Sequence, residues 1–330
     1  MFNKLNLKWL GGIFVVLLLI VCIIALHDSK GSINRNHSFK SKLVEIDSAK
    51  VTSLVIFPKS DKDQIVLSKD GKTWNVSENG NKFNADELSV KNMLGTLSSL
   101  TATRLASRNK SDWKEYEVTD SSATRVQVMT GRKIVADLYV GKFTYQQVQN
   151  ANPYSRRPQG TLTSYLRVSG DDAVYALDGV LSMTFNRKAS DFRNQMIIKS
   201  DKKIWDKLSF TIPGGSFSLV KHNEKWLVDG ILADSTAVVK YLNAIEYIGN
   251  SNFIDHPVLD KTEPDYTLSI EGSNIQSPIK IKAFKTDTAN RFAITSSTNE
   301  GSYFSGKQSD LFNKIFVDKN SFCIPVVTKK

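Results

Sequence analysis

The chain has 330 residues, which is enough for two domains of ordinary size, and 41% of them are hydrophobic while 23% are charged. This balance is typical of a globular protein and excludes wholesale disorder. The formal net charge is +11, but basic and acidic residues alternate along the chain without a block of five or more like charges. We therefore expect a diffuse surface charge and no nucleic-acid partner.

The N-terminus carries a predicted membrane anchor. Residues 9–26 contain no charged residue and, as a helix, would span about 27 Å, which is just enough for the core of a bilayer. Two lysines precede this run, and Trp9 suits the membrane interface. We predict a short tail at 1–8, a transmembrane helix at 9–26 and a polar tether at 27–46.

The alternative to an anchor is a cleaved signal peptide. The apolar run is long for that role, and His27 stands where a cleavage site needs a small residue. Four basic residues follow the span within the tether, so the positive-inside rule alone would direct the large part of the chain into the cytoplasm. A very short N-terminal tail is typical of a signal anchor. We expect a single-pass protein of the cell (inner) membrane, with its large C-terminal part outside the cytoplasm.

Strand and helix patterns follow the tether. Residues 51–57 are rich in branched and aromatic residues, and residues 65–76 read as a hairpin with Asp70-Gly71 at its turn. Asp86 then stands at the expected N-cap of a helix. The apolar residues of this helix recur at helical spacing on one face, at Val90, Met93, Leu94, Leu97 and Leu100.

Two further hairpins are expected, at residues 125–140 and 165–177. Between their inner strands lies a long loop, Phe143 to Ser164. Long loops in compact domains are often either functional or disordered, and Tyr and Arg are enriched at interface hot spots. The binding residues predicted here are Tyr145, Tyr154, Arg156 and Arg157; the alternative is a floppy insertion.

The same pattern then occurs a second time. A Leu and a Lys precede Trp74 and Trp226 by seven and five residues in both places. Asp234 takes the position of Asp86, and a matching apolar stripe follows at Val238, Tyr241, Leu242, Ile245 and Ile248. Strands are expected at 208–220, around Pro213-Gly214-Gly215, and at 267–270, 279–284, 291–294 and 302–305. The loop at 143–164 has no counterpart in the second copy.

These patterns predict an α+β protein with an N-terminal transmembrane helix and two tandem repeated modules, at 47–190 and 191–330. Each module would contain antiparallel β-hairpins or a meander and one packed helix. Trp74 and Trp226 are expected in the two cores, although a Trp can also act as a stacking platform for sugars or bases.

Several motifs resemble the domain-of-unknown-function family 4340. They are Trp-x-Val and Ala-Asp before a helical Leu stripe, Tyr116-Glu117-Val118, Leu138-Tyr-Val-Gly141-Lys142, Tyr165-Leu-Arg-Val, Val174-Tyr-Ala-Leu177 and Asp191-Phe-Arg193-Asn194-Gln195. The resemblance covers about residues 50–260. It implies an extracytoplasmic, membrane-anchored bacterial protein of the cell envelope, often linked to auxiliary components of gliding-motility-type ABC transporters. The family implies no catalytic residues.

The chain shows no motif for catalysis, a metal or a cofactor. Its four histidines have no metal-ligand spacing, and no G-x-S-x-G or P-loop occurs. The adjacent Asp171 and Asp172 follow Gly170 and are expected to form a turn. The two cysteines, Cys22 and Cys323, give no disulfide framework. We expect no catalytic site, no metal site and no cofactor.

The leading hypothesis is a non-enzymatic, membrane-anchored, extracytoplasmic protein-binding subunit that is accessory to a membrane complex, such as an ABC transporter. The alternative is a protein that binds an envelope polysaccharide or another anionic polymer through its basic surface and the loop at 143–164. A third hypothesis is a hydrolase that uses His222 or His256.

Overall fold

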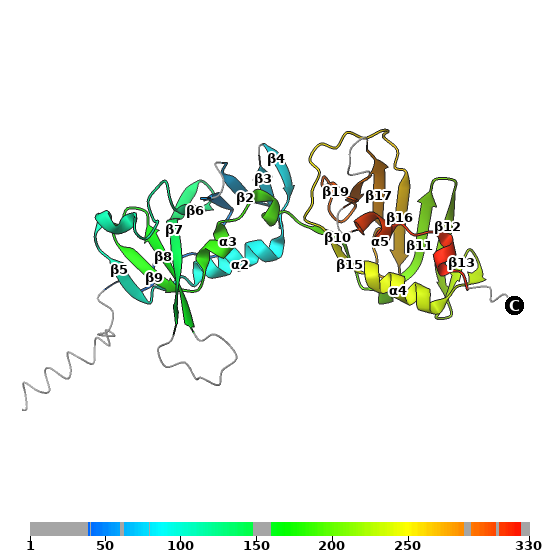
Figure 1. The fold of residues 1–330 in the computed structure, drawn as a ribbon, viewed down its shortest axis with the longest axis horizontal. Coiled ribbons are helices and arrows are strands. Elements are labelled where there is room, and N and C mark those ends of the chain that lie inside the picture. The colour runs from blue at the N-terminus through cyan, green and yellow to red at the C-terminus, as the bar shows by residue number, and fades with distance from the viewer. Residues whose placement is uncertain are drawn as a thin grey trace, which may run out of the picture.

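The computed structural model describes residues 39, 41–59, 63–78, 80–147, 160–286, 292–307 and 310–324. These residues form two large antiparallel sheets and a two-stranded ribbon, with few helices, which confirms the α+β class in a sheet-rich form. The two sheets lie one beside the other and are joined by a narrow connection (Figure 1). The predicted anchor at 9–26 lies outside the described residues, and within them no helix is long and apolar enough to cross a membrane.

The first half of the chain forms a nine-stranded sheet in the order β4-β3-β2-β1-β6-β7-β8-β9-β5. Helices α2 (Glu87–Ser98) and α3 (Leu181–Phe185) share a core with this sheet, and the 3₁₀ helices η1 (Lys110–Trp113) and η2 (Ala189–Phe192) accompany it. The strands are β1 Ser53–Phe57, β2 Ile65–Asp70, β3 Thr73–Glu78, β4 Asn81–Asn84, β5 Arg104–Ser107, β6 Thr124–Thr130, β7 Lys133–Gln147, β8 Gly160–Val168 and β9 Val174–Asp178.

The second half forms an eight-stranded sheet in the order β14-β13-β12-β11-β16-β17-β18-β19. Helices α4 (Ser235–Ile245) and α5 (Leu311–Ile315) contribute to its core, and a separate ribbon pairs β10 (Met196–Lys199) with β15 (Tyr247–Gly249). The strands are β11 Trp205–Ile212, β12 Gly215–His222, β13 Lys225–Val228, β14 Ile231–Leu232, β16 Tyr266–Gly272, β17 Ile279–Lys285, β18 Phe292–Ser296 and β19 Phe304–Ser305; the 3₁₀ helices are η3 Lys202–Ile204 and η5 Lys319–Phe322.

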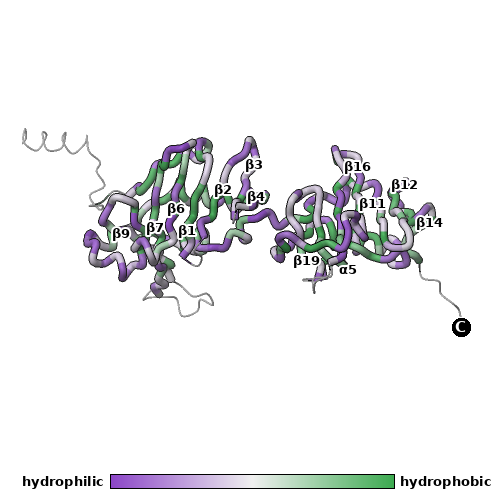
Figure 2. Tube along the Cα trace, turned by 90° about the horizontal axis from the view of Figure 1, so that it is seen from above, coloured by the Kyte–Doolittle hydropathy of each residue, from purple (hydrophilic) through white to green (hydrophobic). Residues whose placement is uncertain are grey.

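Helices α2 and α4 begin after the N-cap residues that the sequence predicts, and they bury the predicted apolar face. The Asp86 carboxylate accepts hydrogen bonds from the backbone N–H groups of Leu88 and Ser89, and Asp234 accepts from Thr236 and Ala237. Every residue of both predicted apolar stripes is buried, but the last of each lies outside the helix, because α2 ends before Leu100 and Ile248 belongs to β15. Because burial of one large apolar side chain contributes about 1.5–3 kcal/mol, the four buried residues within each helix are its main attachment to the sheet. Figure 2 shows hydrophobic stretches running along the strands of both halves.

The structure differs from the sequence-based expectations at three places. The first hairpin turns at Gly71-Lys72 rather than at Asp70-Gly71, because Asp70 pairs directly with Thr73 and Gly71 takes the positive φ. Trp74 is buried, but Trp226 is only partly buried against the second core. Leu43 and Val44 are buried in the first core, so packed structure begins before the end of the predicted tether.

The prediction of an irregular loop over residues 143–164 is wrong at both ends. Strands β7 and β8 remain paired from Phe143↔Ser164 to Gln147↔Gly160, and they extend beyond the rest of the first sheet (Figure 1). We call this extension, residues 143–147 with 160–164, the arm. The alternation of Thr144 and Gln146 with Phe143 and Tyr145 is the strand pattern that this prediction missed.

Candidate functional site

The arm presents one apolar face and one polar face. Directly paired residues of antiparallel strands point to the same side, so Phe143, Tyr145 and Leu162 share a face. Their exposed fractions are 44%, 50% and 39%, which is unusual for three large apolar side chains on one short ribbon. The opposite face carries Thr144, Gln146, Thr161 and Thr163. The arm therefore exposes an apolar surface on regularly paired strands.

Two glycines fix the shape of the arm. At Gly141 a Cβ atom would collide with the carbonyl oxygen of Tyr116, just where the β7–β8 register shifts. At Gly160 a Cβ atom would collide with the outer ring atoms and the hydroxyl of Tyr145, so this side chain lies directly against the glycine. The ring of Tyr145 is therefore held in place although half of its surface is exposed.

A row of alternating aromatic and arginine side chains crosses the sheet near the base of the arm. Phe57, Arg125, Tyr139 and Arg167 are paired in register across β1, β6, β7 and β8. The Arg125 guanidinium lies 5.8 Å from the Phe57 ring and 5.2 Å from the Tyr139 ring. Such contacts stabilise by about 0.5–2 kcal/mol each, so the row stiffens the strands from which the arm extends.

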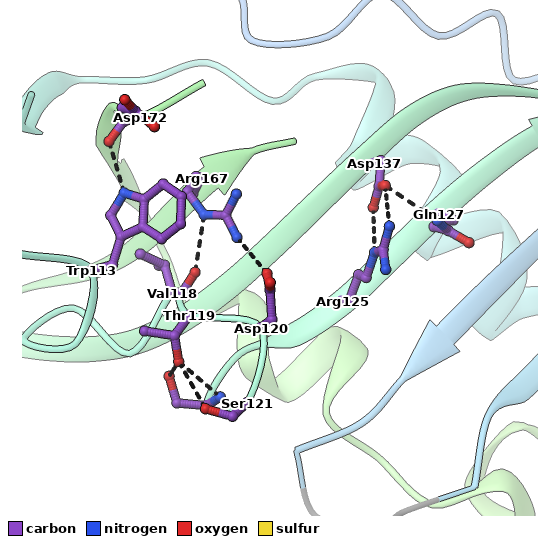
Figure 3. Close-up of polar contacts among 11 residues, drawn as sticks. Trp113, Val118, Thr119, Asp120, Ser121, Arg125, Gln127, Asp137, Arg167 and Asp172 are labelled. Carbon is purple, nitrogen blue, oxygen red and sulfur yellow. Dashed lines mark hydrogen bonds and ion pairs between the residues drawn. The ribbon is translucent and has the colours of Figure 1, made fainter. Parts of the chain in front are cut away.

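Arg167 is the most enclosed member of this row. Its guanidinium carbon lies 3.8 Å from the ring centroids of both Trp113 and Tyr139. Its Nε donates to the Val118 carbonyl oxygen at 3.1 Å, and its Nη2 donates to Asp120 at 3.0 Å (Figure 3). Trp113 is itself held because its indole N–H donates to the Asp172 carbonyl oxygen at 2.8 Å. Arg167 thus fastens the segment after η1 onto the sheet.

Arg125 forms a bidentate ion pair with Asp137. Its Nε and Nη2 donate to the two carboxylate oxygens at 2.8 and 2.6 Å, and Gln127 adds a third hydrogen bond (Figure 3). Burial by itself would raise the pKa of Asp137, but the hydrogen bonds from Arg125 and Gln127 together hold this pKa below its ordinary value. Hydrogen bonding to Asp137 raises the pKa of Arg125 in turn.

Acid should weaken the protein through Asp137. A carboxylate with a lowered folded-state pKa adds stability above its unfolded pKa, near 3.8, and this stability is lost as the pH falls through the folded-state pKa. We expect D137N to be less stable than the unsubstituted chain at neutral pH and to lose less stability between about pH 5 and about pH 2. Urea unfolding at several pH values measures this; equal pH slopes for both proteins would contradict it.

One family profile matches most of the chain and establishes its family. The profile described as "Domain of unknown function (DUF4340)" matches residues 74–269, which is more than half of the chain. The chain belongs to this family. No curated protein and no solved structure matches it. The DUF4340 match confirms the resemblance seen in the sequence motifs, and the matched range includes the arm, its base and the connection between the two sheets.

The junction motif of this DUF4340 chain contains a site that sequence reasoning did not assign. Arg193 is 1% exposed, and its guanidinium lies between Phe83 at 3.5 Å and Phe253 at 3.8 Å. Its Nη1 donates to Asp255 at 2.8 Å. Phe83 belongs to β4 in the first half, whereas Phe253 and Asp255 belong to the second, so one side chain clamps both halves. The signal in the sequence was an arginine between an aromatic residue and two amides, in the motif Asp191-Phe-Arg193-Asn194-Gln195.

The predicted binding residues are only partly placed. Tyr145 lies on the apolar face of the arm, while Tyr154, Arg156 and Arg157 lie outside the described residues. Asp171 forms the expected turn, because it accepts from the Ala173 N–H at 2.9 Å and from the Tyr175 hydroxyl at 2.7 Å. Burial and this hydrogen bond raise the pKa of Tyr175 to about 12.

The histidines of the hydrolase hypothesis lie in unrelated places. His222 and His256 are both exposed, and their Nε2 atoms lie 3.2 Å from Asn223 and 3.3 Å from Asn81, respectively. Within the described ranges, no group of three or more His, Cys, Asp or Glu residues is arranged to hold a metal ion.

Proposed function

We propose that this DUF4340 chain is a non-enzymatic accessory subunit of a membrane complex, and that it binds a protein of that complex through the apolar face of the arm. The observation that carries the proposal is the exposure of Phe143, Tyr145 and Leu162 on a stiffly supported ribbon. Large aromatic side chains with few free torsions are the usual anchors of protein interfaces. The family resemblance favours an ABC transporter as the complex.

The proposal includes an anchor and a location. The apolar sequence of residues 9–26 supports a single-pass helix in the cell (inner) membrane, and the short tail before it supports a C-terminal part outside the cytoplasm. The arm would then reach a partner in the same membrane or at its outer surface.

We also propose that the two halves are tandem copies of one module. Their sheet orders correspond strand for strand, from β4 with β14 to β9 with β19, and β5 is an addition to the first. The pairs α3–η2 and α5–η5 have the same spacing, and Asp86 and Asp234 donate their N–H groups to Phe192 and Phe322 in the same way. On this proposal the first module would include η2 and end after Phe192, two residues later than the boundary expected from the sequence.

Photo-crosslinking on the two faces of the arm tests the proposed function. We expect a photoreactive phenylalanine analogue in place of Tyr145 to crosslink the full chain to one membrane protein, and the same analogue in place of Gln146, on the opposite face, to crosslink far less. A matched pull-down compares the triple variant F143S/Y145S/L162S with the control Q146S/T161S.

The expected loss of partner in the pull-down is large for the apolar face. Three truncated anchors at about 1–2 kcal/mol each weaken binding by more than a hundredfold, whereas the control should retain the partner. Equal recovery with both variants, or equal crosslinking from positions 145 and 146, would exclude the arm as the interface. Circular dichroism of each variant checks that the fold is intact.

A further inference from the structure

A cavity beside Trp74 is lined by lysines from separate parts of the fold. Its volume is about 670 Å³, and it lies between the β2–β3 hairpin, helix α2 and strand β10. Lys69 and Lys72 come from the hairpin, Lys91 comes from α2, and Lys199 comes from β10. Lys69 and Lys199 are 130 positions apart in the sequence. Folding therefore brings together positive charges that are distant along the chain.

The charge of this cavity is not neutralised by the protein. Within the described residues, the four lysine side chains make no ion pair or hydrogen bond, and Glu87 is the one acidic side chain that lines the cavity. Like charges in one cleft repel each other and raise the local concentration of anions. The fold therefore keeps an arrangement that an anion would stabilise.

A glycine in the interior of helix α2 leaves space in the cavity but makes the helix less stable. Gly95 lies in the interior of α2 and lines the cavity, and a Cβ atom added there would meet nothing within 4 Å. Packing therefore does not require glycine at this position. A glycine in a helix interior is destabilising relative to alanine, so an open cavity wall is a reason for its presence.

One residue of the wall, Trp74, carries a neutral hydrogen-bond donor. The indole of Trp74 lines the cavity, and its N–H makes no hydrogen bond within the described part of the chain. Phosphate oxygens accept from lysine ammonium groups and from neutral N–H donors alike.

The corresponding place in the second half lacks this charge. At the same offset from Trp226, Lys221 is present, but Glu224 replaces Lys72 and pairs with Lys221 at 2.8 Å. At the same offsets from Asp234, Val239 replaces Lys91 and Asn243 replaces Gly95. At these corresponding positions, only the first half combines unpaired lysines with a glycine that leaves the cavity wall open.

We propose that the cavity formed by Lys69, Lys72, Lys91, Lys199, Trp74 and Gly95 binds a multiply charged phosphate group. Such a group is carried by soluble pyrophosphate-type compounds, whereas the phosphodiester of an anionic phospholipid such as phosphatidylglycerol carries a single negative charge. This site is independent of the arm and of the protein partner proposed for it.

Titration calorimetry with the full chain in mild detergent tests the proposal. We expect inorganic pyrophosphate to bind saturably at low salt, with one site per chain, and to bind more weakly as the salt concentration rises. Mixed micelles that contain phosphatidylglycerol, compared with phosphatidylcholine alone, distinguish a lipid headgroup from a soluble phosphate. Fluorescence of the chain, compared with that of W74F, locates the bound probe.

Three variants separate a built site from a diffuse basic surface. K72Q/K91Q should weaken pyrophosphate binding about tenfold, since the variant removes two of the four cationic contacts. The matched control K221Q/K225Q removes the same charge from the second half and should change binding less than twofold. G95L should abolish binding while the melting temperature stays equal or rises.

Three results would overturn the proposal. They are no saturable binding of either probe, equal weakening by K72Q/K91Q and K221Q/K225Q, and full binding by a folded G95L protein. Equal weakening by the two double variants would assign any binding to the net charge of the chain, and full binding by G95L would place the bound probe outside this cavity.

Discussion

Replacement of Arg193 by alanine is expected to lower the free energy of unfolding by about 3 kcal/mol and to uncouple the two halves. The substitution leaves a cavity between Phe83 and Phe253 and removes both cation–π contacts and the ion pair with Asp255. Backbone contacts on either side remain, because Asn194 donates to Asn84 in the first half and Asn250 donates to Gln195 in the second. The clamp is lost while the connection stays folded.

A methionine at position 193 should be much less harmful than alanine. The Nε and Nη2 atoms of Arg193 are buried without a hydrogen-bond partner in the described residues, and each such donor costs about 1–3 kcal/mol. R193M fills the space between the rings, removes these unpaired donors and releases the half-exposed Asp255 to water. We expect it to retain more than half of the stability that R193A loses.

Equilibrium unfolding in urea, followed by tryptophan fluorescence and by circular dichroism, measures both effects. The unsubstituted chain should unfold with coincident transitions, and R193A should show two separate ones. D255N serves as the control and should cost less than about 1 kcal/mol because Asp255 is partly solvated. If R193M were as unstable as R193A, the charge of Arg193 rather than its packing would be the stabilising feature.

Local elements of this fold are predictable from the sequence because their signals are local. Asp86 and Asp234 cap their helices through N–H groups two and three residues away, and the apolar stripes follow helical spacing. The turn at Pro213-Gly214 needs only a proline before a glycine with positive φ. The short helices α3 and α5 were missed, because five residues are too few to show a periodicity.

The contacts of the site residues depend on long-range packing, so local sequence patterns could not predict them. Arg167 reaches the Val118 carbonyl oxygen across 49 positions, and Arg193 reaches Asp255 across 62. No known sequence pattern relates residues at either of these separations. Tyr145 was found by its residue type within a segment that the second half lacks, but its exposure and its apolar neighbours Phe143 and Leu162 became evident only from the strand pairing.

Replacement of Arg167 by alanine is expected to cost about 3 kcal/mol and to release the segment between η1 and β6 from the sheet. The guanidinium fills the space between the rings of Trp113 and Tyr139, so its removal loses two cation–π contacts and leaves a gap. It also leaves the buried Val118 carbonyl oxygen without the hydrogen bond from Nε. Lysine cannot replace the planar guanidinium in this stack, so R167K should be nearly as unstable as R167A.

The ion pair of Arg167 with Asp120 should contribute little by comparison. Asp120 is 81% exposed whereas Arg167 is 5% exposed, and such a pair is screened by water on the acidic side. We expect D120A to cost less than about 1 kcal/mol. Urea unfolding gives the stabilities, and amide hydrogen exchange at Tyr116 and Val118 reports local release, which should be faster in R167A but not in D120A. A D120A protein as unstable as R167A would show that the ion pair, not the ring stack, holds this segment against the base of the arm.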